Sequence, residues 1–218
     1  MPEPPRLPCW VVTGPIGAGK STAVAELARL GAAVVDADAA GHAVLAEPEV
    51  AAAVAARYGP DAAPGGVVDR AAVARRVFAD PAELAWLEAL THPRLSRRIA
   101  AALAALARRR PRPPLAVVEA AVYFRLPPWG PVDLVIAVTA PEEVRIRRLV
   151  ASGRFTADEA RRRVAAQRSL LPRFAAADVV IDNGGDAASL RAAVRRLWRE
   201  RGPGADPDAE EVGDEGDA

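Results

Sequence analysis

The 218-residue sequence is poor in cysteine, histidine, aromatic residues and long apolar runs. Its one cysteine, Cys9, excludes an intramolecular disulfide, as is typical of a reducing compartment, so we expect a cytoplasmic protein. No stretch approaches the roughly 18 consecutive apolar residues of a membrane-spanning helix, and residues 1–8 are proline-rich rather than a signal peptide. We therefore expect no membrane partner. The chain also lacks the His and Cys spacing of a structural zinc site.

Lysine is nearly absent, because 28 of the 29 basic residues are arginine. The single lysine lies in a segment that matches the P-loop pattern G-x-x-x-x-G-K-[ST], between a strand pattern at 10–13 and a helical pattern at 21–30. In such a loop, backbone N–H groups and the helix dipole hold phosphates, the lysine follows the transferring phosphoryl group, and the serine binds Mg²⁺. The predicted ligand is a nucleoside triphosphate with Mg²⁺ on Ser21. The predicted binding residues are Gly14, Pro15, Ile16, Gly17, Ala18, Gly19, Lys20, Ser21 and Thr22.

Apolar strand patterns alternate with helical patterns along the chain. The strand patterns cover residues 10–13, 32–35, 115–118, 134–138 and 179–181. This alternation predicts an α/β fold, with a P-loop NTPase-type parallel five-stranded sheet flanked by helices. Helical patterns at 44–58, 70–78 and 81–110 predict a helical acceptor-substrate insertion at 37–114. We expect a flexible N-terminus at 1–9, a single P-loop kinase domain at 10–201 that ends in a helix at 187–201, and a disordered acidic tail at 202–218.

The net charge of +1 conceals an uneven distribution, because residues 202–218 hold seven acidic residues and no basic ones. The remaining residues carry 29 basic against 21 acidic side chains, which suits a phosphate-rich ligand and, by charge alone, nucleic acid. Eight arginines between 145 and 168 predict an arginine-rich lid at 141–171, whose guanidinium groups bind phosphate and exclude water. Aromatic residues for base stacking are scarce, so we expect no nucleic-acid partner.

Polar residues follow the predicted strands at the edge where parallel sheets bind ligands. Asp36 and Asp38 come after the second strand, and a kinase needs a carboxylate near the acceptor hydroxyl. We expect Asp38 to take this role and Asp36 to orient it or lie nearer the metal; the alternative is a turn or helix cap. Asn183 follows the fifth strand, where it contacts a nucleotide base or serves the turn. His92, which Pro93 biases toward extended backbone, faces a ligand or is structural.

In order along the chain, these motifs resemble the dephospho-CoA kinase family. Residues 13–22 resemble its T-G-G-I-G-S-G-K-S-T motif, and residues 34–38 resemble its V-I-D-A-D motif, the most diagnostic of the set. Residues 78–81 and 86–93 are similar to F-x-[ND]-P and W-L-x-x-L-x-H-P, and residues 176–184 to A-D-x-V-I-x-N-x-G. The resemblance extends from about residue 10 to residue 198.

The resemblance implies transfer of the γ-phosphoryl group of ATP, with Mg²⁺, to the 3′-hydroxyl of dephospho-CoA. It implies that Asp38 acts on this hydroxyl beside Lys20, that Arg148 stabilises the transferring phosphate, and that Asn183 lies near the adenine. The expected acceptor-binding residues are Thr13, Asp36 and His92. We expect a monomer. The alternatives are another P-loop small-molecule or nucleoside monophosphate kinase, and a non-catalytic nucleotide-binding regulator.

Three segments depart from the family motifs. Pro15 replaces a glycine and removes one N–H from the loop. Residues 121–125, Ala-Val-Tyr-Phe-Arg, stand in place of P-L-L-[FV]-E and leave the acceptor side open to variation. Ser152 stands where a lid arginine is common, and Arg154, two residues later, is the candidate substitute.

Overall fold

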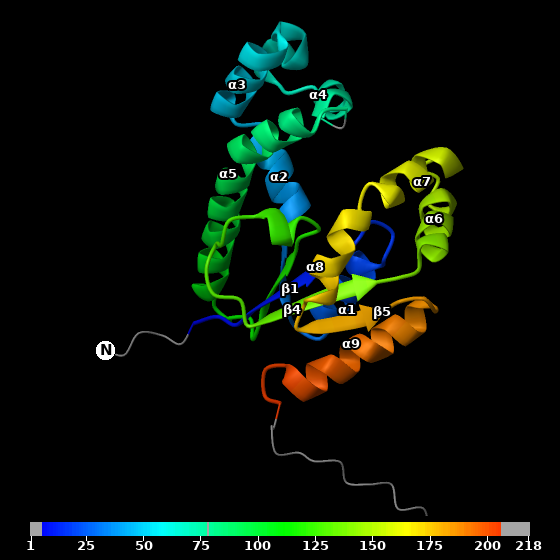
Figure 1. The fold of residues 1–218 in the computed structure, drawn as a ribbon. Coiled ribbons are helices and arrows are strands. Elements are labelled where there is room, and N and C mark those ends of the chain that lie inside the picture. The colour runs from blue at the N-terminus through cyan, green and yellow to red at the C-terminus, as the bar shows by residue number, and fades with distance from the viewer. Residues whose placement is uncertain (1–5, 78, 206–218) are drawn as a thin grey trace, which may run out of the picture.

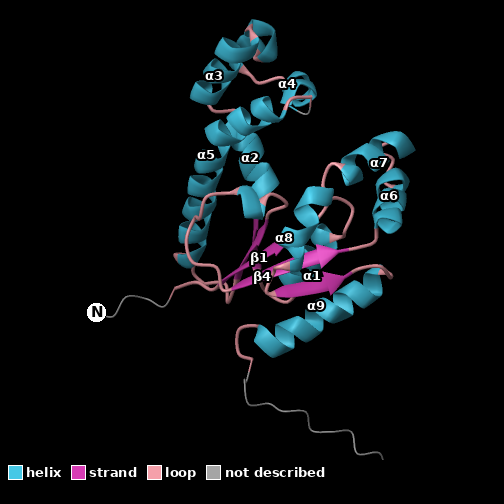
Figure 2. Cartoon of the chain, in the orientation of Figure 1, coloured by secondary structure: helices cyan, strands magenta, loops and turns pink. Residues whose placement is uncertain are grey.

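The computed structural model describes residues 6–77 and 79–205. Its centre is a five-stranded sheet of order β2-β3-β1-β4-β5 in which all neighbouring strands run parallel (Figures 1 and 2). The predicted α/β fold is confirmed, and each predicted strand differs by at most one residue at either end. The strands are β1 (Cys9–Thr13), β2 (Ala33–Asp36), β3 (Ala116–Glu119), β4 (Leu134–Thr139) and β5 (Val179–Asp182).

Helices cover both faces of this sheet, as the uninterrupted apolar character of its strands requires. Alternate residues of β1 face two separate cores: Cys9 and Val11 on one side, Trp10 and Val12 on the other. The core of Trp10 and Val12 is closed by α1 (Lys20–Arg29) and α9 (Ala187–Arg201), and this final helix has the predicted bounds. The core of Cys9 and Val11 is closed by α2 (Ala37–Leu45), α3 (Pro48–Tyr58), α4 (Arg70–Val77) and α5 (Pro81–Ala107).

The single helix predicted for 44–58 is wrong, because the chain forms two helices, α2 and α3, on either side of Ala46 and Glu47. Pro48 is the first residue of α3. Proline has no N–H to donate and suits the first turn of a helix, so it starts a new helix here rather than continuing α2. Two short 3₁₀ turns, Pro60–Ala62 and Pro64–Gly66, then connect α3 to α4.

The expectation of extended backbone at His92 is also wrong, since α5 runs without interruption through Pro93. Two side chains near the proline donate to backbone carbonyls of the preceding turn. Thr91 Oγ1 donates to the Leu87 carbonyl at 2.7 Å, and Arg94 Nη1 donates to the Leu90 carbonyl at 2.9 Å.

A second group of helices follows β4, and Figure 1 shows it well separated from α3 and α4. It comprises α6 (Glu142–Ala151), α7 (Ala157–Ala165), a 3₁₀ turn (Arg168–Leu170) and α8 (Leu171–Ala175). Leu149, Ala160 and Val164 form a small core between α6 and α7. We call these two helices the α6–α7 hairpin; it occupies the segment for which a lid is predicted.

The residues outside the described part of the chain are 1–5, Phe78 and 206–218, and the last of these ranges holds most of the predicted acidic tail. At the N-terminus, Leu7 is buried and Arg6 forms an ion pair with Asp133. Cys9, assigned to the flexible segment by prediction, is the first residue of β1; burial raises the pKa of its thiol to about 11, which keeps it protonated at neutral pH. Among the described helices, none has the length and apolar character needed to cross a membrane.

Candidate active site

The loop between β1 and α1 is a tight turn that depends on glycine. Gly14 and Gly19 have φ values of 139° and 106°, which side-chain-bearing residues rarely adopt. A Cβ atom on Gly14 would lie 2.1 Å from the Val138 carbonyl oxygen, and one on Gly19 would lie 2.3 Å from Asn183 Nδ2. The loop therefore packs directly against β4 and against the residue that follows β5. This packing holds the start of α1 beside the carboxyl ends of the strands.

Lys20 begins α1, and its ammonium group folds back over the loop. Nζ donates hydrogen bonds to the carbonyls of Gly14 at 3.0 Å and Pro15 at 3.2 Å. Burial lowers the pKa of Lys20, and the charges of Glu119 and Asp38 oppose this shift. A phosphate anion bound at the loop would compensate the buried ammonium and favour its charged form.

Glu119, the last residue of β3, was not among the residues selected from the sequence. Ser21 Oγ donates a hydrogen bond to Glu119 Oε1 at 2.9 Å. Burial raises the pKa of Glu119; Ser21 and Lys20 oppose the shift, and the charges of Asp36 and Asp38 add to it. The signal in the sequence is an acidic residue directly after a predicted strand. This acidic residue reaches the P-loop only because β3 lies next to β1, and the sequence does not reveal the order of the strands.

Asp36 and Asp38 have different surroundings although they are two residues apart. Asp36 Oδ1 accepts hydrogen bonds from the backbone N–H groups of Asp38 at 2.8 Å and Ala39 at 3.0 Å, so Asp36 is the N-cap of α2. The helix-cap alternative therefore describes Asp36. Asp38 has no such bond among the described residues and lines the cavity beside the P-loop.

A cavity of ≈ 500 Å³ joins the P-loop to the rest of the predicted site. It brings together Lys20, Asp38, Glu119 and Arg148, which come from four different elements. The cavity is also lined by Ser152, which stands where a lid arginine is common in the family, and by Arg154, the candidate substitute. The remaining lining residues are Ile16, Gly17, Gly19, Ser21, Thr22, Ala121, Leu149, Phe155 and Gln167. Thr13 and His92 do not line this cavity.

Arg148 and Asn183 meet behind the P-loop. Asn183, 4% exposed, donates from Nδ2 to the Ala18 carbonyl at 2.7 Å. Arg148 Nη2 donates to the Gly185 carbonyl at 2.8 Å, which ties α6 to the loop after β5. The Asn183 side-chain amide thus holds the backbone of the P-loop at Ala18. Its contact with an adenine ring stays a prediction.

Gln167, just after α7, is a second residue that the sequence did not single out. Its Oε1 accepts a hydrogen bond from the backbone N–H of Ile16 at 2.7 Å. The α6–α7 hairpin is therefore linked to the tip of the P-loop across 151 residues of sequence. Nothing in the local pattern distinguishes this glutamine from a solvent-exposed one.

His92 lies outside the cavity, on α5, beside the turn at Tyr123–Arg125. Its Nδ1 is 3.1 Å from the Arg125 carbonyl oxygen. Burial lowers the pKa of His92, against the opposing charge of Glu88. Arg125, at the altered family position, forms an ion pair with Glu88. The arginine at this altered position thus pairs with a residue of α5. A role for His92 in acceptor binding stays a prediction.

Comparison with known proteins agrees with this geometry. The family model described as dephospho-CoA kinase matches residues 9–189. The chain belongs to the dephospho-CoA kinase family. A dephospho-CoA kinase of Moorella thermoacetica is 39% identical over 191 residues, covering 87% of this chain and 90% of its own. One of Deinococcus radiodurans is 38% identical over 190 residues, covering 85% and 90%. The resemblance drawn from the motifs is confirmed.

Solved structures support the fold. The crystal structure of TT1252 from Thermus thermophilus superposes with a TM-score of 0.72 at 32% identity, covering 90% of this chain and 99% of its own. A dephospho-CoA kinase from Campylobacter jejuni has a TM-score of 0.55 at 23% identity, covering 88% and 96%. The second likeness concerns the fold alone.

Proposed function

We propose that this protein is an ATP-dependent dephospho-CoA kinase, which transfers the γ-phosphoryl group of ATP to the 3′-hydroxyl of the dephospho-CoA ribose. The observation that carries the proposal is the convergence of Lys20, Asp38, Glu119 and Arg148 on one cavity beside the P-loop. A phosphate loop, two cationic side chains and a carboxylate near the acceptor are the groups that phosphoryl transfer requires. Membership of the dephospho-CoA kinase family supports this acceptor.

The donor side of the site suits a triphosphate with Mg²⁺. Among the described residues, no three His, Cys, Asp or Glu side chains form a group that could hold a metal ion. Mg²⁺ in kinases is commonly held by one or two protein groups together with phosphates and water. Ser21 and Glu119, joined by a hydrogen bond of 2.9 Å, fit this arrangement. When bound, Mg²⁺ neutralises charge on the phosphates.

In the proposed mechanism, Asp38 orients the acceptor hydroxyl and takes its proton as the bond to phosphorus forms. The Lys20 ammonium leaves the carbonyls of Gly14 and Pro15 to contact the phosphate, where it offsets the negative charge on the transferring group. Arg148 adds a second positive charge from α6, and direct in-line transfer needs no covalent enzyme intermediate. Thr13, Asp36 and His92 are proposed to contact the acceptor, within the helical segment 37–114 and its border with the sheet. We also propose a cytoplasmic monomer that binds no nucleic acid.

The test is ADP release from ATP and Mg²⁺ with dephospho-CoA as acceptor, compared with AMP, adenosine and shikimate. Turnover with dephospho-CoA alone, with coenzyme A as product, is the expected result, and Lys20→Ala serves as the inactive control. Turnover with a different acceptor would support another P-loop kinase. ATP binding without turnover would support a regulator.

A further inference from the structure

The segment between α5 and β3 carries a group of arginines that the proposed function does not use. We call it the arginine loop, and its four members are Arg108, Arg109, Arg110 and Arg112. The first three are exposed, and within residues 6–77 and 79–205 none of the four forms an ion pair. Prolines at 111, 113 and 114 restrict the backbone, so a partner that binds here orders little additional chain. The arginine loop is therefore an exposed positive surface without a described counter-charge.

The arginine loop lies at the amino edge of the sheet, at the opposite end of the strands from the P-loop. It leads into β3, and the ring of Pro114 would lie 3.7 Å from a Cβ atom on Gly31, just after α1. The Ala33 N–H donates to the Leu115 carbonyl at 2.8 Å, where β2 and β3 begin. The P-loop and Asp38 follow the carboxyl ends of strands. The length of the strands therefore separates the arginine loop from the proposed active site.

Helix α9 brings the end of the described chain to this same edge. It starts beside the P-loop, where a Cβ atom on Gly19 would lie 3.3 Å from Leu190 Cδ2. It then runs antiparallel to the strands (Figure 1), and near its end the ring of Trp198 lies edge-on to Trp10, with centroids 6.0 Å apart. Trp10 belongs to β1, which pairs with β3 from the first residue of each strand. The chain therefore leaves α9 at the edge that holds the arginine loop.

Residues 206–218, which follow the described chain, have the opposite charge. They hold seven acidic residues and no basic one. Thirteen residues span at most about 45 Å when extended, whereas five strands about 4.8 Å apart form an edge roughly 20 Å wide. This acidic segment can therefore reach the arginine loop from any point on the amino edge. Arg199 and Arg201, in the last turn of α9, add positive charge where the segment begins.

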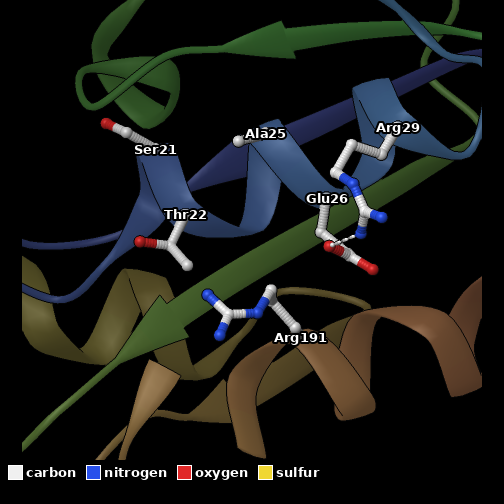
Figure 3. Close-up of a pocket in the computed structure, with 6 residues that line it drawn as sticks. All are labelled: Ser21, Thr22, Ala25, Glu26, Arg29 and Arg191. Carbon is white, nitrogen blue, oxygen red and sulfur yellow. Dashed lines mark hydrogen bonds and ion pairs between the residues drawn. The ribbon is translucent and has the colours of Figure 1, made fainter. Parts of the chain in front are cut away.

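Three other arginines of α1 and α9 already have carboxylate partners. Glu26, which is 1% exposed, accepts from Arg29 at 3.0 Å and from Arg195 at 2.8 Å. Figure 3 shows the Arg29 guanidinium turned toward Glu26 in the groove between the two helices. Arg196 lies 3.5 Å from Glu200. The arginine loop, in contrast, offers four guanidinium groups that no described carboxylate neutralises.

We propose that the acidic segment 206–218 docks on the arginine loop of its own chain. Single ion pairs at a protein surface are weak and are screened by salt, but several pairs held by one tethered segment act together. Docking at this edge covers positive charge that would otherwise attract polyanions, and it leaves the cavity beside Lys20 and Asp38 open. The proposal does not depend on which acceptor the enzyme phosphorylates.

The experiment attaches a spin label to the acidic segment of the full chain through Gly216→Cys. Cys9 is buried and its thiol stays protonated at neutral pH, so the added cysteine is the one that reacts. Nuclear magnetic resonance then measures how strongly the label broadens each backbone amide signal. We expect the amides of the arginine loop to lose most of their peak intensity at low salt. They should recover it at about 1 M salt, where the screening length falls to roughly 3 Å.

Two sets of substitutions separate docking on this loop from a general charge effect. The first removes three charges from the arginine loop: Arg108→Ser, Arg109→Ser and Arg110→Ser. The matched control removes three exposed charges from α7: Arg161→Ser, Arg162→Ser and Arg163→Ser. The first set should abolish the broadening at residues 107–113, and the control should leave it unchanged. Thermal unfolding of each variant establishes that it is folded.

A change on the acidic side tests the same contact without altering the described part of the chain. It neutralises the residues around the label: Asp214→Asn, Glu215→Gln and Asp217→Asn. This variant should also lose the broadening at the arginine loop. The proposal is overturned if the label broadens no amide of the loop, or if it broadens the α6–α7 hairpin instead. It is also overturned if the same broadening arises when the spin label and the isotope label are on different molecules, because the contact would then join two copies of the chain.

Discussion

Ser21 on α1 and Glu119 at the end of β3 are joined by a hydrogen bond of 2.9 Å between Oγ and Oε1. This bond fixes the first turn of the P-loop helix against a strand that is 98 residues distant in the sequence. It also places a carboxylate beside the hydroxyl that P-loop proteins use for Mg²⁺. The pair therefore connects the sheet to the proposed metal site.

Glu119→Gln removes the charge while keeping an oxygen that can accept from Ser21. If Glu119 helps to position Mg²⁺, kcat should fall roughly 100-fold and the Mg²⁺ concentration for half-maximal activity should rise. Steady-state assays over a Mg²⁺ series measure both effects. Glu200→Gln, a surface substitution on α9, is the matched control. An unchanged Mg²⁺ dependence would show that Glu119 does not act through the metal.

Asp38→Asn tests the proposed base. An amide cannot take the acceptor proton, so kcat should fall by about 10²–10⁴, with the Kd of ATP nearly unchanged. The matched variant is Asp36→Asn, because asparagine is also a good N-cap and α2 should remain intact. Asp36→Asn is expected to raise the acceptor KM with little loss of kcat. Near-normal kcat in Asp38→Asn would contradict the assigned role.

Gln167→Leu removes the acceptor for the Ile16 N–H, which Gln167 Oε1 binds at 2.7 Å. Loss of one partner of such a bond costs about 1 kcal/mol, so kcat/KM for ATP should fall roughly 5-fold. Gln167→Glu keeps an accepting oxygen and should retain most of the activity, which separates the bond from simple packing. If both variants behave alike, the link between the hairpin and the P-loop does not contribute to activity.

The strands were predictable from the sequence because a parallel sheet covered on both faces needs continuous apolar runs, such as Trp10 to Thr13. The capping box of α7 is predictable for a similar local reason: Thr156 and Glu159, three residues apart, each bond to the other's backbone N–H. The expectation at His92 failed because a proline inside a helix removes one N–H donor without necessarily ending the helix, and α5 continues through Pro93.

The missed site residues depend on contacts between distant segments. Glu119 gains its position from the order of strands in the sheet, and Gln167 from the placement of α7 over the P-loop. Neither the strand order nor the placement of α7 is indicated by the residues that neighbour Glu119 or Gln167 in the sequence. By contrast, Lys20 and Asp38 could be selected because their motifs place them at strand ends, where a parallel sheet binds its ligands.

Stability at acid pH should depend on Glu26. Its burial alone would raise its pKa, but hydrogen bonds from Arg29 and Arg195 hold the pKa of Glu26 below its ordinary value. A carboxyl with a lowered folded-state pKa contributes stability that is fully present above the unfolded value of about 4.3, and this contribution is lost as pH falls through the folded pKa. Arg195→Ala leaves one Glu26 oxygen without its donor.

Arg195→Ala should therefore lower the melting temperature at neutral pH by several degrees, and the difference from the wild type should shrink as pH falls through the lowered pKa of Glu26, where the carboxyl becomes protonated in both proteins. Thermal unfolding followed by circular dichroism between pH 3 and pH 7 measures this, over roughly the range in which carboxyls titrate. Arg191, one turn earlier on the same helix, forms no ion pair in the described residues, although its charge helps to lower the pKa of Asp186, so the unfolding of Arg191→Ala should differ from that of the wild type much less than the unfolding of Arg195→Ala does. A melting difference for Arg195→Ala that stayed constant from neutral to acid pH would mean that Arg195 stabilises α9 by packing, not by neutralising the buried Glu26.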